Sequence, residues 1–594
     1  MKTRHRVSLA LCTLFLLTSA ACRSNDASTA EDGAPAFIDP LVLSRSQCSG
    51  LKPPAVKPTA AQMADADQRF TFGAPYALPD RLVEQFHVEI STGNPAAQSW
   101  FDVGLAHMAN FNHDEAIAAF RKAQDLDPTC AMCFWGEGLA FGSNINAPFE
   151  APRGLAGRVA AERALERAED ISPRETALIN ALSTRYHLAE DGTVTEAAMA
   201  YAEAMETVAE EFPEDPFILS LAAEANMDTQ PWDYWQANAR VPKGRTDKTV
   251  DMLEHALEID PDYAPAIHLY IHTTEASVDP FRAEAYADSL AGQSLGVGHL
   301  VHMPSHIYLR LGRWQKSHTA NIAAIAADER YIAESENAGF YGAVYYPHNV
   351  HFVLANAQLA GNADTAMTMA GKLASLVEID PAAPAPLAEH IAASQIFSAV
   401  QFGEDDAVLA FEEPAAPHLY MRAAWHYARG TVHARQGDMA LAEAELKALA
   451  RMSVDEDLEA YAAYGAPIAA VLDVASSTLK GRIAHANGDL GAAIAHLDAA
   501  ADMADSLPYF EPTWWYYPTR QTLGAYLLAD GQADRAEREF YRTLIKSPNS
   551  AYALHGLAEA YAAKGDRPSE VHARHLFNEA WMGDANERPD LGAF

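Results

Sequence analysis

The sequence predicts an all-α protein, a right-handed superhelical solenoid built from stacked helix pairs. Three observations support this prediction. Glycine, alanine and aromatic residues return at fixed spacings through most of the chain. Asp-Pro dipeptides recur ahead of candidate helices. The chain of 594 residues is 49% hydrophobic, which is enough to form an extended core.

The clearest repeat begins at Trp100. Large residues and a glycine mark its first helix, and an alanine and an aromatic residue mark its second: Trp100, Val103, Gly104, His107, Ala116, Phe120, Ala123 and Pro128. These spacings match the tetratricopeptide repeat (TPR) pattern. A second copy contains Gly524, Leu527, Gly531, Ala536, Phe540 and Pro548. One helix pair cannot bury its apolar face alone, so the copies must stack.

The chain divides into five predicted segments. Residues 1–22 form a signal peptide, and residues 23–75 form a flexible tether rich in Ala, Pro, Ser and Asp. Three TPR arrays follow, at 76–240, at 241–400 (rich in histidine) and at 401–594.

Residues 1–22 have the layout of a bacterial lipoprotein signal. Basic residues precede an apolar run over 7–17, which is too short to span a bilayer, and small residues lead to Cys22. This end resembles a lipobox, in which the cysteine is lipidated, although Ser19 stands where leucine is usual. Ordinary signal cleavage is the alternative. Because Arg23 follows Cys22 rather than aspartate, the resemblance implies an outer-membrane anchor facing the periplasm.

Cys48, Cys130 and Cys133 are the other cysteines of the exported chain. In an oxidising compartment we expect a disulfide, either between Cys130 and Cys133 or from Cys48 to one of them. A redox or metal role is the alternative. Phe134 follows Cys133 where covalent haem attachment would need histidine.

The net charge of −37 argues against nucleic acid as a partner, because it repels phosphate backbones. The sequence has no phosphate-binding Gly-rich loop, no GxSxG elbow and no HExxH. We therefore expect neither nucleotide binding nor serine hydrolase chemistry. The aromatic block 509–517 either packs between repeats or stacks on a sugar or peptide ring.

The central array carries an unusual set of histidines. His268 and His272 lie four residues apart, hence on one helix face, and His302 and His306 repeat the pair 34 residues later. Repeat phasing places all seven on the groove side of three consecutive first helices: His268, His272, His299, His302, His306, His348 and His351. Since neighbouring helices lie roughly 8–10 Å apart, these imidazoles could converge.

Histidines three or four residues apart on helices are typical of metal sites. An all-imidazole set suits one or two ions of zinc, copper, nickel or iron, and not calcium or magnesium. Glu275 follows His272 by three residues and is a candidate ligand, ligand-orienting carboxylate or general base. It could equally be a solvated charge, and each histidine could be an ordinary polar contact on a helix face.

Several segments carry a family resemblance. FNHDEA at 111–116, GHLVHMPSH at 298–306, YPHN at 346–349 and WYYP at 515–518 resemble a family of long exported bacterial TPR proteins with a histidine-rich central segment. The resemblance spans about residues 95–580. It implies the repeat architecture and leaves the activity open.

Two functions of different classes remain. The first is a membrane-anchored metalloprotein, with a metal-dependent oxidoreductase or hydrolase activity as one form of it. The second is a metal-free scaffold that binds a peptide or protein in its concave groove.

Overall fold

The computed structural model describes residues 56–585, apart from 238, 294, 456–457, 464 and 517, together with residues 589 and 591. The predicted signal peptide, Cys22 and Cys48 lie outside the described residues.

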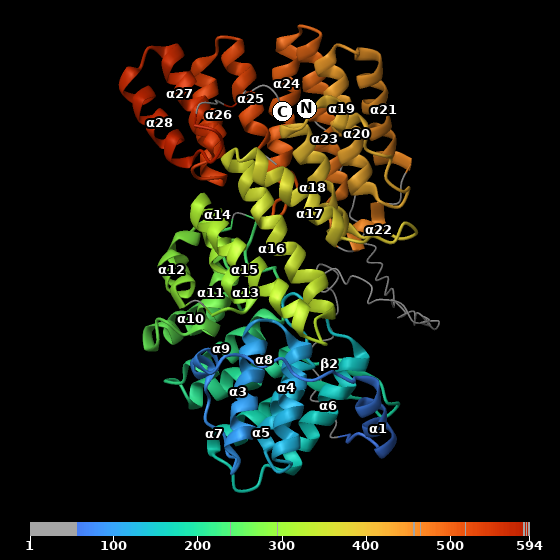
Figure 1. The fold of residues 1–594 in the computed structure, drawn as a ribbon, viewed down its shortest axis with the longest axis vertical. Helices are drawn as coiled ribbons and strands as arrows, with labels where there is room; N and C mark the ends of the chain where they lie inside the picture. The colour runs from blue at the N-terminus through green and yellow to red at the C-terminus, as the bar shows by residue number, and fades with distance from the viewer. Residues whose placement is uncertain are drawn as a thin grey trace, which may run out of the picture. The chain divides into compact units, whose positions relative to one another are not determined.

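The described part is almost entirely helical (Figure 1). The N-terminal elements are α1 (Ala60–Arg69), α2 (Asp80–Val83), η2 (Glu84–Phe86), α3 (Pro95–Ala109), α4 (His113–Leu126), α5 (Ala131–Ala140), α6 (Ala151–Glu166), α7 (Pro173–Leu182), β1 (Tyr186–Leu188), β2 (Val194–Glu196), α8 (Ala198–Glu211) and α9 (Pro216–Met227). The central elements are α10 (Thr246–Ile259), α11 (Ala264–Glu275), η3 (Pro280–Ala283), α12 (Glu284–Gln293), α13 (Gly298–His302), α14 (Pro304–Arg310), α15 (Trp314–Glu334), α16 (Gly339–Ala360), α17 (Ala363–Leu376) and α18 (Pro386–Phe402). The C-terminal elements are α19 (Asp405–Leu409), α20 (Leu419–Gln436), α21 (Met439–Asp455), α22 (Leu458–Ala463), α23 (Ile468–Ala486), α24 (Leu490–Asp505), α25 (Thr519–Ala529), α26 (Ala533–Lys546), α27 (Ala551–Lys564) and α28 (Arg567–Ala580).

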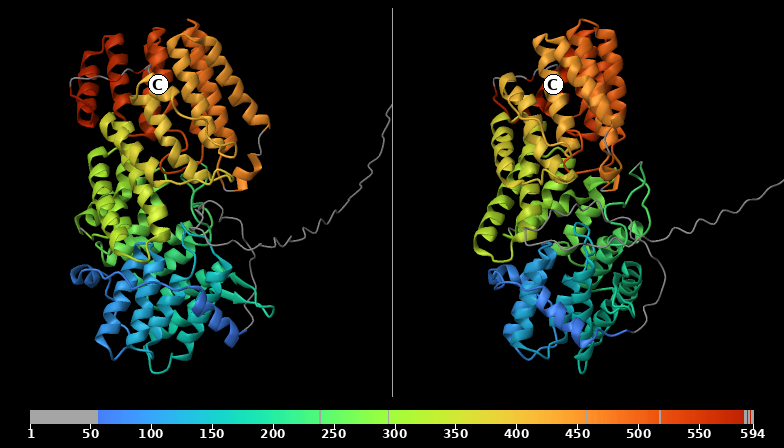
Figure 2. Two further views of the ribbon diagram at one scale, coloured as in Figure 1. Left: turned by 45° about the vertical axis from the view of Figure 1, so that its right-hand side comes forward. Right: turned by 90° about the vertical axis from the view of Figure 1, so that its right-hand side faces the viewer.

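Successive helices pack as pairs, and each pair packs on the next. The pairs α3–α4, α15–α16, α23–α24 and α27–α28 pack closely, and the red helices of the last pair lie side by side at the C-terminal end of the ribbon (Figures 1 and 2). The strands β1 and β2 form one short antiparallel hairpin. The predicted all-α solenoid of helix pairs is therefore confirmed.

One aromatic residue locks each of the two strongest repeats. The Phe120 side chain is fully buried, and a Cβ added at Gly104 or Gly136 would lie 2.4–2.5 Å from its ring. Phe540 has the same relation to Gly524 and Gly556, at 2.6 and 2.3 Å. Both phenylalanines lie on second helices and each pair of glycines lies on adjacent first helices, so the small residues let three helices close around one ring.

The segment expected to be a flexible tether contains structure after residue 56. Helix α1 has a capping box at Thr59 and Gln62. Asp67 pairs with Arg163 of α6 at 2.7 Å. This part of the segment is thus packed on the repeats rather than a free linker, because its polar and apolar contacts offset the entropy of ordering it.

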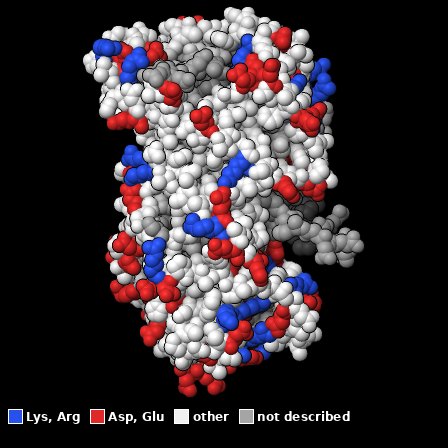
Figure 3. All heavy atoms as spheres, viewed as in Figure 1, with Lys and Arg blue, Asp and Glu red and all other residues white. Residues whose placement is uncertain are grey.

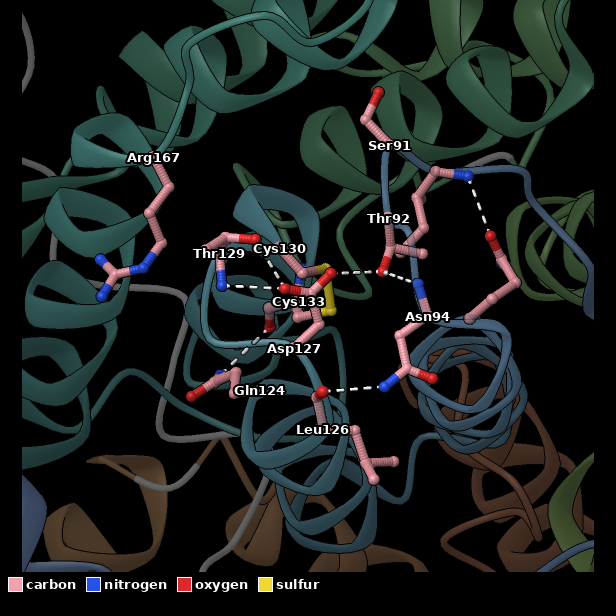
Figure 4. The surroundings of a disulfide bond; sticks show 12 residues. Ser91, Thr92, Asn94, Gln124, Leu126, Asp127, Thr129, Cys130, Cys133 and Arg167 are labelled. Carbon is pink, nitrogen blue, oxygen red and sulfur yellow. Dashed lines mark hydrogen bonds between the residues drawn. A yellow bond between two sulfur atoms is a disulfide. The ribbon is translucent and has the colours of Figure 1, made fainter.

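Cys130 and Cys133 form a disulfide at the start of α5 (Figure 4). Around it, Thr92 Oγ1 donates a hydrogen bond to Asp127 Oδ2 at 2.5 Å, and Asn94 Nδ2 donates to the Leu126 carbonyl at 2.8 Å. These bonds connect the start of α3 to the end of α4. The disulfide therefore lies where this helix pair ends and the next one begins with α5.

The C-terminal helices return to the middle of the chain. Trp314 Nε1 donates to the Asn549 carbonyl at 2.8 Å. Trp314 and Ala360 share an apolar cluster with Leu554 and Phe577 of α27 and α28. The solenoid therefore has contacts between helices that are far apart in sequence.

Charged side chains of both signs are spread over the face shown in Figure 3. Among the described residues, no helix is both long and apolar enough to cross a membrane.

Candidate metal centre

Three consecutive first-helix positions supply the histidines. These are α11, the helix formed by α13 and α14, and α16. The second of these is broken after Met303, because Pro304 has no amide hydrogen to continue the helical ladder. His302 and His306 lie on either side of this break.

The cluster is buried, which differs from the open groove expected from repeat phasing. The side chains of His268, His272, His299, His302 and His306 are at most 2% exposed. Two segments outside the three first helices cover them. One is Phe111 in the α3–α4 turn, and the other is the connection 506–518 between α24 and α25.

Phe111 has φ 54°, a left-handed conformation that is unusual for a bulky residue. Its ring packs 4.4 Å from the ring of His268 and 5.2 Å from that of His299, measured between centroids. A residue held in such a conformation indicates a locally over-determined site.

Six of the seven predicted histidines, with Glu275, form groups that could hold a metal ion. In each group one ligand atom per residue lies within 4.8 Å of the others. The groups are His268–His272–His299, His302–His306–His348 and His272–Glu275–His306. The first two share no residue, so the described residues offer two separate all-histidine sets joined by Glu275.

Two pairs of ring nitrogens are especially close. The Nε2 atoms of His268 and His299 are 3.1 Å apart, and those of His302 and His306 are 2.8 Å apart. Nitrogens on one tetrahedral ion, at bonds of about 2.0–2.1 Å, are separated by about 3.3–3.4 Å. Small movements would therefore bring each pair onto one ion.

Buried acceptors orient these rings. Glu275 accepts hydrogen bonds from His272 Nδ1 at 2.9 Å and from His306 Nδ1 at 2.7 Å. Asn321 of α15 accepts from His302 Nδ1 at 2.5 Å. A proton on Nδ1 leaves Nε2 with a free lone pair, which is the usual arrangement of metal-bound histidine. The Nε2 atom of His272 has no hydrogen-bond partner.

Burial sets most of the charges. It lowers the pKa values of His268, His299 and His302 well below their usual range, and it also lowers that of His272. These imidazoles are neutral near pH 7 and can donate lone pairs.

His306 differs from its neighbours. Burial disfavours its charged form, but the carboxylates of Glu275 and Glu511 outweigh burial and raise its pKa to about 10. The pKa of Glu511 is raised well above its usual range by burial and by the nearby Glu275. A metal ion would replace the proton on His306.

Glu511 was not predicted from the sequence, and Tyr509 was predicted only as part of the aromatic block 509–517, not as a contact of the histidine cluster. Glu511 Oε2 contacts His306 Nδ1, and the Tyr509 hydroxyl donates to Glu275 Oε2 at 3.1 Å. The aromatic block was noticed, but no periodicity connects it to residues more than 200 positions earlier.

His351 is separate from the metal-type groups found among the described residues. Its ring packs against His390 of α18, with centroids 5.2 Å apart. His107, one of the repeat-pattern residues, is buried, and its Nε2 lies 3.2 Å from the Tyr76 carbonyl oxygen.

A cavity of about 120 Å³ adjoins the cluster. One wall is formed by His272, His299, His306 and His348. Other lining residues come from α16, α18 and the 506–518 connection, and they include Tyr345, Ile391, Tyr509, Phe510 and Glu511.

A comparison with known protein families identifies one repeat. The tetratricopeptide repeat model matches residues 97–130. No curated protein matches the chain significantly.

Solved structures of similar kind include the human IFIT1 dimer with PPP-AAAA, at 12% identity, covering 87% of this chain and 99% of that one, with a TM-score of 0.30. Yeast Tom70 is 12% identical, the match covers 80% of this chain and 90% of that one, and the TM-score is 0.27. The P58(IPK) TPR domain is 14% identical, the match covers 59% of this chain and 90% of that one, and the TM-score is 0.18. At these values the likeness does not extend to function.

The fold and site together define a class of protein, a TPR-type solenoid with a buried cluster of histidines able to hold a metal ion. The exported family resembled by the sequence has no counterpart among these matches.

Proposed function

We propose that this chain is a metal-binding TPR protein that holds one or two transition-metal ions in its histidine cluster. The observation that carries the proposal is the approach of Nε2 atoms from separate positions, at 3.1 and 2.8 Å. His268 and His299 are both neutral near pH 7, so their facing Nε2 atoms need one donor and one acceptor, whereas a shared ion would accept a lone pair from each. Between His302 and His306 an ion would take the place of the proton that His306 carries.

The two all-histidine sets divide the ligands. His268, His272 and His299 would hold one ion, and His302, His306 and His348 would hold the other. Imidazole ligands favour zinc, copper, nickel or iron. Three protein ligands leave a fourth position for water or a small molecule, which is typical of catalytic rather than structural zinc sites.

Glu275 supports both sets without being needed as a ligand. It accepts from Nδ1 of one ring in each set, so it would orient both rings with Nε2 toward the ion.

The test is metal content. We would measure it by mass spectrometry, before and after chelation, for the natural chain and for the double variant His302→Ala, His306→Ala. The matched control is His426→Ala, His433→Ala, which removes two buried histidines of α20 outside the cluster. We expect near-stoichiometric metal in the natural chain and the control, and loss of most metal in the first variant.

A natural chain that carries no metal, and takes up none of zinc, copper, nickel or iron, would refute the proposal. The alternative is then a metal-free scaffold for a peptide or protein partner. Its support is the TPR match at residues 97–130, since repeats of this type form extended binding surfaces.

We also propose that Cys22 anchors the chain to a membrane, with the outer membrane facing the periplasm as the expected location. The support is the signal-like segment that ends at Cys22. Cys22→Ser should move the protein from the membrane to the soluble fraction. Equal solubility of both forms contradicts the anchor.

A further inference from the structure

We infer that the cavity beside the cluster binds a small aromatic molecule whose anionic oxygen, a carboxylate or a phenolate, coordinates the metal. This inference rests on the proposed metal binding and adds the class of ligand.

The size of the cavity fits one aromatic ring. Its volume is about 120 Å³, and an apolar cavity of about 150 Å³ is known to bind benzene. A benzoate or a phenol fills such a space, whereas a peptide or a sugar chain does not.

The walls match the faces of a ring. Trp232 packs edge-on against His272, with centroids 5.1 Å apart, and Tyr345 packs at 4.7 Å from His299. Phe510 is held by stacking on Trp514 at 4.1 Å. Aromatic surfaces placed in this way favour offset or edge contacts with a ligand ring.

The lining includes polar atoms that belong to the metal-type groups or lie beside them. Nε2 of His272 and Nδ1 of His299 have no hydrogen-bond partner. Val344, Leu387 and Ile391 add apolar surface to the same cavity. An amphipathic ligand can therefore place its oxygen at the metal and its ring against apolar residues.

The charge of the site makes binding depend on the metal. Glu275 and Glu511 both contact His306, which lines the cavity, so the metal-free site offers an anionic oxygen two acceptor carboxyl groups and no metal ion. A divalent ion reverses the local potential.

The experiment is calorimetric titration of the full chain with benzoate and with acetate, before and after removal of the metal. Acetate has the same donor atoms without the ring. We would use Ile391→Trp to fill the cavity and Ile391→Leu as the control of equal volume, and measure metal content in every sample. Ile391 contacts the cavity and belongs to none of the metal-type groups.

We expect benzoate to bind the metal-loaded chain at least about tenfold more tightly than acetate, since burial of a ring contributes several kcal/mol. Ile391→Trp should weaken benzoate binding at least about tenfold at unchanged metal content, by occupying the ring's space. Ile391→Leu should bind as the natural chain does.

Equal affinity for benzoate and acetate overturns the inference, as does undiminished benzoate binding by metal-loaded Ile391→Trp or equal binding by the metal-free chain. A natural chain without metal overturns the proposed function, and this inference with it. Intact metal content without benzoate binding overturns the inference alone.

Discussion

Glu275→Gln tests the orienting carboxylate without removing an imidazole. Glu275 is fully buried and accepts hydrogen bonds from His272, His306 and Tyr509. Glutamine has nearly the same shape, but its amide offers one oxygen and one NH₂ group. Whichever ring keeps the oxygen, the other ring's N–H faces a second donor.

The expected effect follows from these contacts. Loss of such an outer hydrogen bond lowers metal affinity about 10–100-fold. Because Glu275 accepts from one ring in each histidine set, the binding of both ions should weaken. We expect metal affinity to fall about 100-fold, which is ~2.7 kcal/mol of binding free energy.

Affinity would be measured by competition with a chelator of known strength. Glu445→Gln is the matched control, because Glu445 also accepts from a histidine, His426 Nδ1 at 2.7 Å, outside the cluster. Circular dichroism checks that both variants are folded. If Glu275→Gln retains metal as tightly as Glu445→Gln does, the orienting role is wrong.

Three further predictions concern stability and redox state. Phe120→Ala and Phe540→Ala should each lower the free energy of unfolding by about 3–5 kcal/mol in urea titrations, and losses below about 1 kcal/mol would contradict the locking role. Burial lowers the pKa of His113 to about 3. As the pH falls, this histidine is therefore protonated in the unfolded state before it is protonated in the folded state. The stabilisation is present above about pH 6.5 and is lost as pH falls toward 3. The difference in stability between the natural chain and His113→Gln should therefore shrink by about 2 kcal/mol between pH 7.5 and 5, and a constant difference refutes it. Thiol titration of the denatured, non-reduced mature chain should find no more than one free thiol, because Cys130 and Cys133 are joined. Three free thiols would contradict this.

The fold was predictable because its signals are local. Gly104, Ala116 and Phe120 specify one helix pair, and the same pattern at Gly524, Ala536 and Phe540 specifies another. The register of the histidine pairs, 34 residues apart, was also enough to predict that they would face one another. The metal-type groups contain all of these pairs.

The walls of the site were not predictable in the same way. Glu511 and Tyr509 reach His306 and Glu275 only because the C-terminal repeats return toward the centre. That return depends on the cumulative rotation of many repeats, which no single motif encodes. His351 was predicted to join the cluster, because its position in the repeat matches that of the other histidines. Its ring packs against His390 instead. A periodicity defines a face, and neighbours on that face decide which way a side chain points.

The position of the 506–518 connection has a consequence for incomplete chains. Repeats in a solenoid are stabilised mainly by adjacent repeats, so a chain cut before residue 506 could keep its helices through α24. It would nevertheless lack the carboxyl group of Glu511 and the hydroxyl group of Tyr509, and one side of the buried histidines would open to water. Tight retention of the ion would then report that synthesis and folding had reached the last repeats, and proteolytic damage at the far end of the chain would release it.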